Sequence, residues 1–294
     1  MLDLRDLECL VALTRQRHFA KAAETCGMSQ PAFSMRIRNL EERLDTQIVK
    51  RGNRFQGLTA EGQTIVNHAL GILDQVRTLE EEVRAAKGEV VGRLVLAAIP
   101  TATAFAAHVA HRLREGNPGI RTRIESTTSL AIQQGIEDGR FDAGLTYADA
   151  ASADFLRIDE LYREKYVLLV PDSLNPGKSA SMTWAKAAEL PLILLEPEMQ
   201  NRRILDRIFE EAGVEPDVVA ETNGFMAAVV MAMQGMGATV LPQVLVEALG
   251  TFDRAALVSL TDPAVERAVC LVTPRRGQGI PVVEALRRTV LPGR

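Results

Sequence analysis

The sequence predicts an α/β protein that begins with a helix-rich segment. Residues 1–58 carry apolar side chains at helical spacing on both sides of a glycine break. Residues 59–88 carry one long helical pattern, and from residue 92 onward short apolar runs alternate with helical patterns. Strands that alternate with helices favour α/β units on mostly parallel sheets. We therefore expect a helical N-terminal domain, a linker helix and an α/β domain over residues 92–294.

The N-terminal segment is predicted to form a winged helix-turn-helix. Gly27 separates two helical patterns, and glycine easily adopts the left-handed backbone of a tight turn. Ser29 can cap the helix that follows, and Pro31 is tolerated in its first turn. The polar stretch Arg51–Arg54 suits a wing. The side chains expected on the apolar faces of the three helices are Leu4, Leu7, Val11, Thr14, Phe19, Ala22, Ala23, Cys26, Phe33, Ile37, Leu40 and Leu44.

The charge distribution points to a polyanionic partner for this segment alone. The whole chain carries a net charge of −4. Residues 1–58 nevertheless hold ten Lys and Arg against seven Asp and Glu, whereas residues 59–294 hold 24 against 31. A positive excess confined to a helix-turn-helix is typical of DNA binding, and the acidic remainder would be repelled by phosphate.

The long helix over residues 59–88 carries a heptad seam. Apolar side chains recur at alternating spacings of four and three, which is typical of a coiled coil that joins two copies of a chain. The alternative is an ordinary amphipathic helix that lies on a core. A helix of this length would be a rod of roughly 40 Å. The predicted dimerisation residues are Ile65, Ala69, Ile72, Val76, Leu79 and Val83.

Polar residues follow several predicted strands of the α/β domain, at the points where helices begin. Ligands of such domains bind where strands end, and helix N-termini with hydroxyl groups bind anions well. We therefore predict a site for a small polar or anionic effector, such as a small carboxylate. The alternative is that these residues are helix caps and that Arg202 is a surface charge. The predicted effector-binding residues are Pro100, Thr101, Thr103, Thr128, Ser129, Thr146, Tyr147, Asn201, Arg202, Asn223 and Phe225.

An ordered set of residues resembles the LysR-type transcriptional regulators. The set comprises Phe19, Ala22–Ala23, Met28–Ala32, Ser34, Ile37, Leu40–Glu41, Leu44, Lys50–Arg51 and Leu58–Gly62. The resemblance covers essentially the whole chain, because length, linker heptads and the two-part α/β pattern also agree. The sequence departs from the family at Asp45, where glycine is usual, and at Ile48–Val49, where Leu-Phe is usual. Both departures lie near the wing, and the fold that the resemblance implies does not depend on them.

The resemblance implies more than the spacing shows. It implies a two-lobe, periplasmic-binding-protein-like α/β domain, with lobe I over residues 92–162 and 268–294 and lobe II over 163–267. It implies chain crossings near Leu161–Glu164 and Val265–Ala268, an effector cleft between the lobes and no cofactor. It also implies a homodimer or homotetramer, inverted-repeat promoter DNA and RNA polymerase as partners. Residues 142–147 and 199–203 resemble a LysR subgroup found beside formate dehydrogenase operons.

The helix after Gly27 is expected to enter the major groove with its N-terminal residues at base edges. Glutamine can pair with adenine and arginine with guanine, so Gln30, Ser34, Met35 and Arg38 are assigned to bases. Arg36, Arg51 and Arg54 are candidates for phosphate, although Arg36 is equally well explained as a solvated charge. The predicted DNA-binding residues are Ser29, Gln30, Pro31, Ser34, Met35, Arg36, Arg38, Arg51 and Arg54.

Other classes of protein are less well supported. The sequence has no G-x-S-x-G, P-loop or dinucleotide-binding glycine motif, so an enzyme is not expected. His108 and His111 share a helix face but have no further ligand at metal-binding spacing, and a surface position is expected for both. Cys9, Cys26 and Cys270 show no disulfide or metal pattern. No signal peptide or membrane span is predicted, so we expect a cytoplasmic protein. A metabolic enzyme or a solute-binding protein with an α/β cleft remains the alternative.

Overall fold

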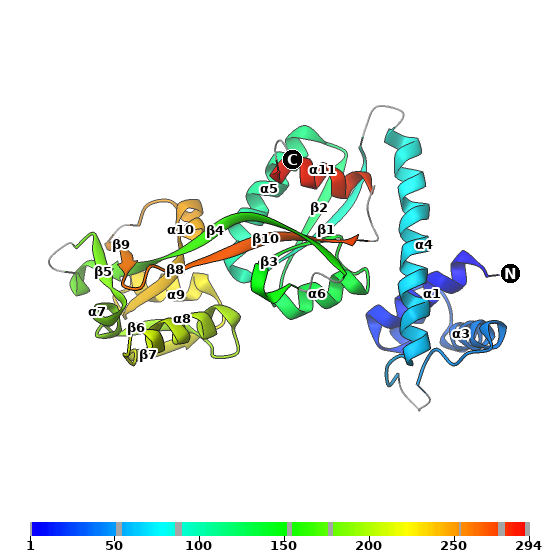
Figure 1. Ribbon diagram of the computed structural model, residues 1–294, viewed down its shortest axis with the longest axis horizontal. Helices are drawn as coiled ribbons and strands as arrows, with labels where there is room; N and C mark the ends of the chain where they lie inside the picture. The colour runs from blue at the N-terminus through cyan, green and yellow to red at the C-terminus, as the bar shows by residue number, and fades with distance from the viewer. Residues whose placement is uncertain are drawn as a thin grey trace.

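Three parts follow one another in the computed structural model, which describes residues 2–50, 55–85, 90–151, 155–175, 179–252, 254–275 and 280–291. The N-terminal helices and the long helix α4 lie at one end of the molecule (Figure 1). Lobe I of the α/β domain comes next, and lobe II lies at the opposite end. Within the described residues, no helix is both long and apolar enough to cross a membrane.

The N-terminal part is the predicted helix-turn-helix, built from α1 (Leu4–Gln16), α2 (Phe19–Thr25) and α3 (Gln30–Leu44). Gly27 has a φ of +64°, and the Ser29 side chain caps α3 by accepting a hydrogen bond from the backbone N–H of Ala32. Most of the predicted apolar faces are buried in one core. The face of α1 was placed slightly wrong, because Leu4 is 43% exposed whereas Leu10 and Leu13 are fully buried.

Helix α4 (Ala60–Ala85) starts as part of this N-terminal domain. Its side chains Val66, Ala69 and Leu70 are buried in the same core as α1 and α3. The Thr59 hydroxyl accepts a hydrogen bond from the Gly62 N–H at 2.8 Å and so caps the helix. A Cβ atom on Gly62 would lie 2.2 Å from the carbonyl oxygen of Ile48, so only glycine fits here.

We expect Gly62→Ala to destabilise the N-terminal domain by about 1–3 kcal/mol, since the methyl group meets rigid backbone. Gly71→Ala on the same helix is the matched control. Its added Cβ atom would have no neighbour within 4 Å, so the domain should become more stable by up to about 1 kcal/mol. Thermal melting combined with hydrogen exchange of residues 33–40 measures both effects. Equal effects of the two substitutions would contradict the steric explanation.

Lobe I begins with the parallel strands β1, β2 and β3. Its elements are β1 (Gly92–Ala98), a 3-10 turn (Pro100–Ala102), α5 (Thr103–Gly116), β2 (Ile120–Ser126), α6 (Ser129–Glu137), β3 (Ala143–Tyr147), a second 3-10 turn (Ala148–Ala150) and α11 (Pro281–Val290). Strand β1 pairs in parallel with both β2 and β3. Parallel strands bring the N-termini of the helices that follow them to one edge of the sheet, which is where the cleft lies.

Two long strands run between the lobes, β4 (Leu156–Pro171) and β10 (Glu266–Pro274). Up to Lys165, β4 pairs with β10, and from Tyr166 onward it pairs with β8 and β9 of lobe II. In Figure 1 the two strands form the ribbon that joins the lobes. The change of partner falls beside the predicted crossing at Leu161–Glu164.

Lobe II repeats the α/β arrangement. Its elements are a 3-10 turn (Asp172–Leu174), β5 (Ser181–Thr183), α7 (Trp184–Ala188), β6 (Leu192–Leu195), α8 (Gln200–Glu211), β7 (Val218–Thr222), α9 (Phe225–Met233), β8 (Ala238–Pro242), α10 (Gln243–Leu249) and β9 (Ala255–Thr261). Strands β7, β6 and β8 are parallel neighbours. The elements β5, α7, α10 and β9 were not predicted.

Candidate functional site

The exposed side of α3 presents the residues predicted to read DNA bases. Gln30, Met35 and Arg38 are exposed, whereas Ser34 is half-buried. The Gln30 side-chain amide donates to the Ser34 hydroxyl at 3.1 Å, which holds both polar groups at the N-terminal turns of the helix. Ser29 and Pro31 are also exposed at this end. The opposite face of α3 is fixed in the core, so this surface has a defined direction.

Arg38 and Arg36 have different surroundings on this helix. Among the described residues, the structure gives Arg38 no hydrogen bond or ion pair. Arg36 donates to the Asp6 carboxylate at 2.7 Å, and Arg43 also pairs with Asp6, whose side chain is only 2% exposed. A buried carboxylate needs such partners. Arg36 therefore joins α3 to α1, which favours a structural role over the phosphate contact that we predicted.

The base of the predicted wing lies within the described residues, whereas residues 51–54, which are predicted to form its tip, do not. Val49 and Leu58 form an antiparallel bridge, and the Lys50 N–H donates to the Gly57 carbonyl at 3.0 Å. The Glu41 carboxylate accepts from the N–H groups of Ile48 and Val49 at 2.8 and 2.9 Å. This contact joins α3 to the wing. The predicted phosphate residues Arg51 and Arg54 belong to the part that is not described.

The backbone at Asp45 accounts for one departure from the family pattern, the aspartate where glycine is usual. It caps the C-terminus of α3 with a φ of +46°, the left-handed conformation in which glycine is favoured. Aspartate is among the few other residues that tolerate this conformation. The turn into the wing therefore keeps its geometry without a glycine.

The heptad seam on α4 divides into two parts. Ala69 is buried in the N-terminal core and Ile65 packs against it. The first turns of α4 therefore form an amphipathic helix that lies on a core, which was the alternative to a coiled coil. Ile72, Leu79 and Val83 are 40%, 62% and 55% exposed. Val76 is half-buried. An exposed apolar stripe at heptad spacing is the surface that a coiled-coil partner would cover.

A cleft of about 280 Å³ lies between the lobes, where α6 and α8 begin. None of the described residues that line it is charged. The Ser129 hydroxyl of lobe I donates to the Gln200 side-chain oxygen of lobe II at 2.5 Å, so the two walls touch. The amide group of Asn201 is buried and has no hydrogen-bond partner among the described residues. The lining residues are Ile99, Pro100, Ser126, Thr127, Thr128, Ser129, Tyr147, Met199, Gln200, Asn201 and Asn223.

Six predicted effector residues line this cleft, namely Pro100, Thr128, Ser129, Tyr147, Asn201 and Asn223. The other five do not. Arg202 pairs with Asp206 and Glu221, at 2.7 and 2.6 Å, and is thus held away from a ligand. Phe225 is buried in an apolar cluster of lobe II. Thr101, Thr103 and Thr146 lie at the same strand ends but outside the lining.

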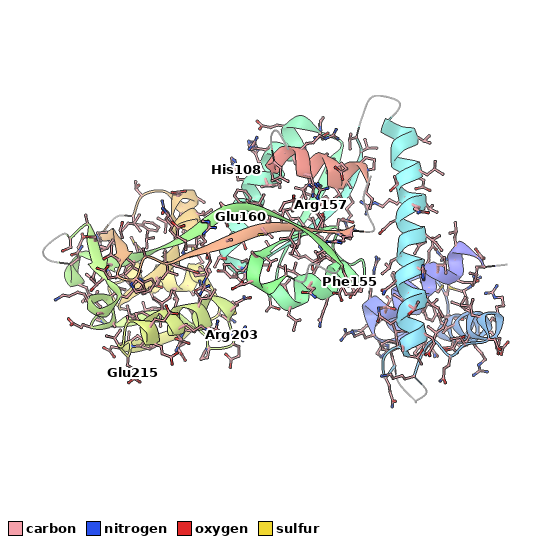
Figure 2. The ribbon with its side chains drawn as sticks, in the orientation of Figure 1. His108, Phe155, Arg157, Glu160, Arg203 and Glu215 are labelled. Atoms are coloured by element: carbon pink, nitrogen blue, oxygen red, sulfur yellow. The ribbon has the colours of Figure 1, made fainter. Side chains whose placement is uncertain are left out.

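Ile99, Ser126, Thr127, Met199 and Gln200 line the cleft but were absent from the predicted set. The sequence signal for Thr127 and Gln200 was their place beside predicted helix starts. Ile99 and Met199 resemble core residues, and only the arrangement of the lobes brings them to the cleft. In the same segment, Arg203 extends away from the body of α8 (Figure 2) and is exposed.

A buried carboxylate lies behind the cleft, on the strand that joins the lobes. Glu164 is fully buried and accepts a hydrogen bond from the Tyr147 hydroxyl at 2.7 Å. The Tyr147 hydroxyl in turn lies 3.2 Å from the Thr101 hydroxyl, within hydrogen-bond distance. Thr101 therefore faces Tyr147 and not the cleft. Burial raises the pKa of Glu164 to about 7. This network connects the wall of the cleft to the strand β4.

Glu164 should make the stability of the protein depend on pH. Its pKa in the folded chain lies above the ordinary value of 4.5, so the folded state keeps a proton that the unfolded state has lost. The stabilisation is complete below about pH 4.5 and is lost as pH rises through about 7. Glu164→Gln should reduce the change in unfolding free energy between pH 5 and pH 8 by about 2–3 kcal/mol. Urea unfolding across this range measures it.

Glu160→Gln is the matched control for this substitution, because Glu160 is exposed on the same strand (Figure 2). It should leave the pH profile of stability unchanged. The explanation fails if Glu164→Gln and the wild-type protein lose stability in parallel between pH 5 and pH 8.

All four histidines are exposed, and all three cysteines are buried. His108 and His111 are exposed as predicted, and His108 lies on the outer side of α5 (Figure 2). Cys9, Cys26 and Cys270 are free and buried. Within the described ranges, no group of three or more histidine, cysteine, aspartate or glutamate side chains could hold a metal ion.

Two family models match the chain. One describes the bacterial regulatory helix-turn-helix protein of the lysR family and matches residues 4–63. The other describes the LysR substrate binding domain and matches residues 87–293. The chain belongs to the LysR family. It is therefore a LysR-type transcription regulator, with an N-terminal helix-turn-helix domain and a C-terminal two-lobe effector-binding domain.

Relatives and solved structures agree with this assignment. This LysR protein is 28% identical to the HTH-type transcriptional regulator AlsR of Bacillus subtilis over 245 residues, which cover 82% of the chain and 80% of AlsR. It is 26% identical to the DNA-binding transcriptional dual regulator OxyR of Escherichia coli over 292 residues, which cover 97% of the chain and 95% of OxyR.

Two solved structures show the same fold. A full-length OxyR variant from Pseudomonas aeruginosa matches with a TM-score of 0.78 and 24% identity, over 99% of this chain and 95% of that one. Full-length CbnR in complex with its target DNA matches with a TM-score of 0.61 and 20% identity, over 98% and 99%.

Proposed function

We propose that this LysR regulator binds promoter DNA as a dimer and responds to a small carboxylate in the interlobe cleft. The observation that carries the proposal is the convergence of the N-termini of α6 and α8 on an uncharged cleft. Helix N-termini present unpaired N–H groups and partial positive charge, which favour an anion. No side chain of the described residues caps α8, so its first N–H groups are available to a ligand.

The lining of the cleft supplies hydrogen-bond donors for such a ligand. The hydroxyl groups of Thr128 and Ser129 and the buried amide of Asn201 can each donate a hydrogen bond. Burying the Asn201 amide without a partner costs about 1–3 kcal/mol, so a ligand that satisfies it gains that energy. Arg202 has no part in this proposal, because its guanidinium is already paired.

A thermal-shift screen tests the effector proposal. Sodium formate, acetate, oxalate and pyruvate would be compared with sodium chloride and with acetamide at equal concentration. At least one carboxylate should raise the melting temperature, because a ligand that binds the native state stabilises it. Asn201→Ala should weaken that carboxylate about tenfold.

Asn117→Ala is the matched control. Asn117 caps the C-terminus of α5 and does not line the cleft. No shift with any carboxylate, or equal shifts in the wild type and Asn201→Ala, would reject a carboxylate bound at Asn201.

Peroxide sensing through cysteine is not part of the proposal, although relatives include hydrogen peroxide-inducible genes activators. Burial raises the pKa of Cys9 to about 12 and that of Cys270 to about 11. The reactive form of cysteine is the thiolate, which is scarce in both residues near neutral pH.

The remaining predictions concern assembly and surroundings. The exposed stripe of α4 supports a dimer, and a pair of such dimers would form the tetramer. A regulator of this kind acts on chromosomal DNA together with RNA polymerase, so we place it in the cytoplasm. The resemblance of residues 199–203 to the subgroup beside formate dehydrogenase operons makes formate the first carboxylate to test.

A further inference from the structure

Helix α6 has its two ends at two different places in the molecule. Its N-terminal residue Ser129 lines the cleft and bonds Gln200 of lobe II. Beyond its C-terminus, the carbonyl oxygens of Asp138 and Gly139 accept hydrogen bonds from the guanidinium of Arg15. Because Arg15 belongs to α1, the helix extends from the effector cleft to the DNA-binding domain. Its nine residues span about 13 Å.

The contact of Arg15 with these two carbonyls, here called the Arg15 contact, fits the chemistry of a helix end. The last carbonyl groups of a helix have no partner within it and carry partial negative charge, so a guanidinium is a favourable partner. The Nε–H of Arg15 donates to the Asp138 carbonyl at 3.2 Å. The DNA-binding domain is thus docked on lobe I by hydrogen bonds to backbone atoms.

The packing at Gly139 is close. Its φ is +68°, and a Cβ atom there would lie 2.6 Å from the Leu70 side chain of α4 and 2.8 Å from the Arg15 guanidinium. The body of α6 is also closely packed, because Ile132 and Ile136 are buried in the core of lobe I. A stiff helix in a close-packed setting transmits a displacement rather than absorbing it.

A second contact between the N-terminal domain and lobe I lies near the Arg15 contact, because Arg77 and Asp142 line the same hollow as Arg15 and Gly139. Arg77 of α4 pairs with the Asp142 carboxylate at 2.6 Å and donates to the Arg93 carbonyl, also at 2.6 Å. Asp142 also accepts from the Val95 N–H, so this pair is anchored in the sheet of lobe I. Arg77 therefore joins α4 to lobe I at a second place, in addition to the contact at Gly139.

We propose that α6 carries the state of the cleft to the DNA-binding domain through the Arg15 contact. A ligand at the N-terminus of α6 competes with Gln200 for the Ser129 hydroxyl and shifts the helix along its axis. The carbonyls at the other end then move relative to Arg15, and α1 rotates with the rest of its domain. This rests on the proposed function, because it takes the cleft as the ligand site.

Hydrogen exchange on the full-length protein tests the link without a ligand or DNA. Gln200→Trp places a bulky side chain against the N-terminus of α6. Gln200→Ala only removes the bond to Ser129, and it is the variant to use if Gln200→Trp does not fold. Either variant should change the exchange rates of α1, residues 4–16, by at least threefold. The same change combined with Arg15→Gln should leave the α1 rates at those of Arg15→Gln alone.

Matched controls separate the contact from general strain. Gly139→Ala should uncouple α1 as Arg15→Gln does, whereas Gly235→Ala should not, since Gly235 also has a positive φ but no neighbour within 4 Å of an added Cβ. Arg112→Gln replaces an exposed arginine of α5 and should change nothing.

The proposal is overturned if α1 does not respond to either Gln200 variant, or if it responds equally with and without Arg15. The hydrogen-exchange experiment uses no carboxylate, so its result does not depend on the outcome of the carboxylate screen. A response of α1 that depends on Arg15 therefore supports the link even when every carboxylate fails.

Discussion

Arg38→Ala should weaken binding to promoter DNA by about 10- to 100-fold without unfolding the protein, since loss of a base-contacting arginine costs about 1–3 kcal/mol. Arg38 is exposed on α3 between the buried residues Ile37 and Leu40, so its direction is fixed by the core. The structure gives it no partner within the described part of the chain. Its guanidinium is thus available for the guanine contact that arginine makes in the major groove.

Gel retardation with DNA from directly upstream of the protein's own gene measures this loss, and circular dichroism checks the fold. Arg112→Ala removes an exposed arginine from α5 and is the matched control for net charge. Specificity should fall together with affinity, because a base contact is lost and not only a phosphate contact. Unchanged affinity and specificity in Arg38→Ala would remove α3 from base recognition.

Leu79→Glu should convert the protein to a monomer and weaken its binding to a two-site promoter by 100-fold or more. Leu79 is 62% exposed at the centre of the free part of the heptad seam. A carboxylate at this position would be buried in the apolar contact between the two copies, which opposes association. Two linked DNA-binding domains gain affinity because the second binds at high local concentration, and a monomer loses that gain.

Analytical ultracentrifugation and gel retardation, performed on the same samples, test the two parts of this result. Leu249→Glu makes the same chemical change at an exposed leucine of α10 and should keep both the dimer and the affinity. A Leu79→Glu variant that remains dimeric would place the main dimer contact elsewhere in the chain.

Much of the N-terminal domain could be predicted because its structure is set by local spacing. The helices, the turn at Gly27 and the cap at Ser29 depend on residues only a few positions apart. The role of Arg36 could not be predicted in this way. Its partner Asp6 lies thirty positions earlier, and a charge on a helix surface gives no sign of which neighbour it will meet.

The cleft between the lobes was predictable in part for the same reason. Hydroxyl residues at predicted helix starts identified Thr128 and Ser129, because strand ends and helix starts meet at one edge of a parallel sheet. Arg202 also lies at a helix start, but Glu221 of the neighbouring strand β7 binds it. The pairing of β6 with β7, which brings these two side chains together, is a long-range contact that periodicity does not show.

Helix α4 sets a limit on how members of such a family can be recombined. Its first turns complete the core of the DNA-binding domain through Val66 and Leu70, so that domain ends well inside the helix. A fragment that stops at residue 63, the end of the helix-turn-helix match, would leave an open apolar surface. A chimaeric regulator should therefore be joined after Leu73, which lets the helix bring its own share of the core to any new sensor.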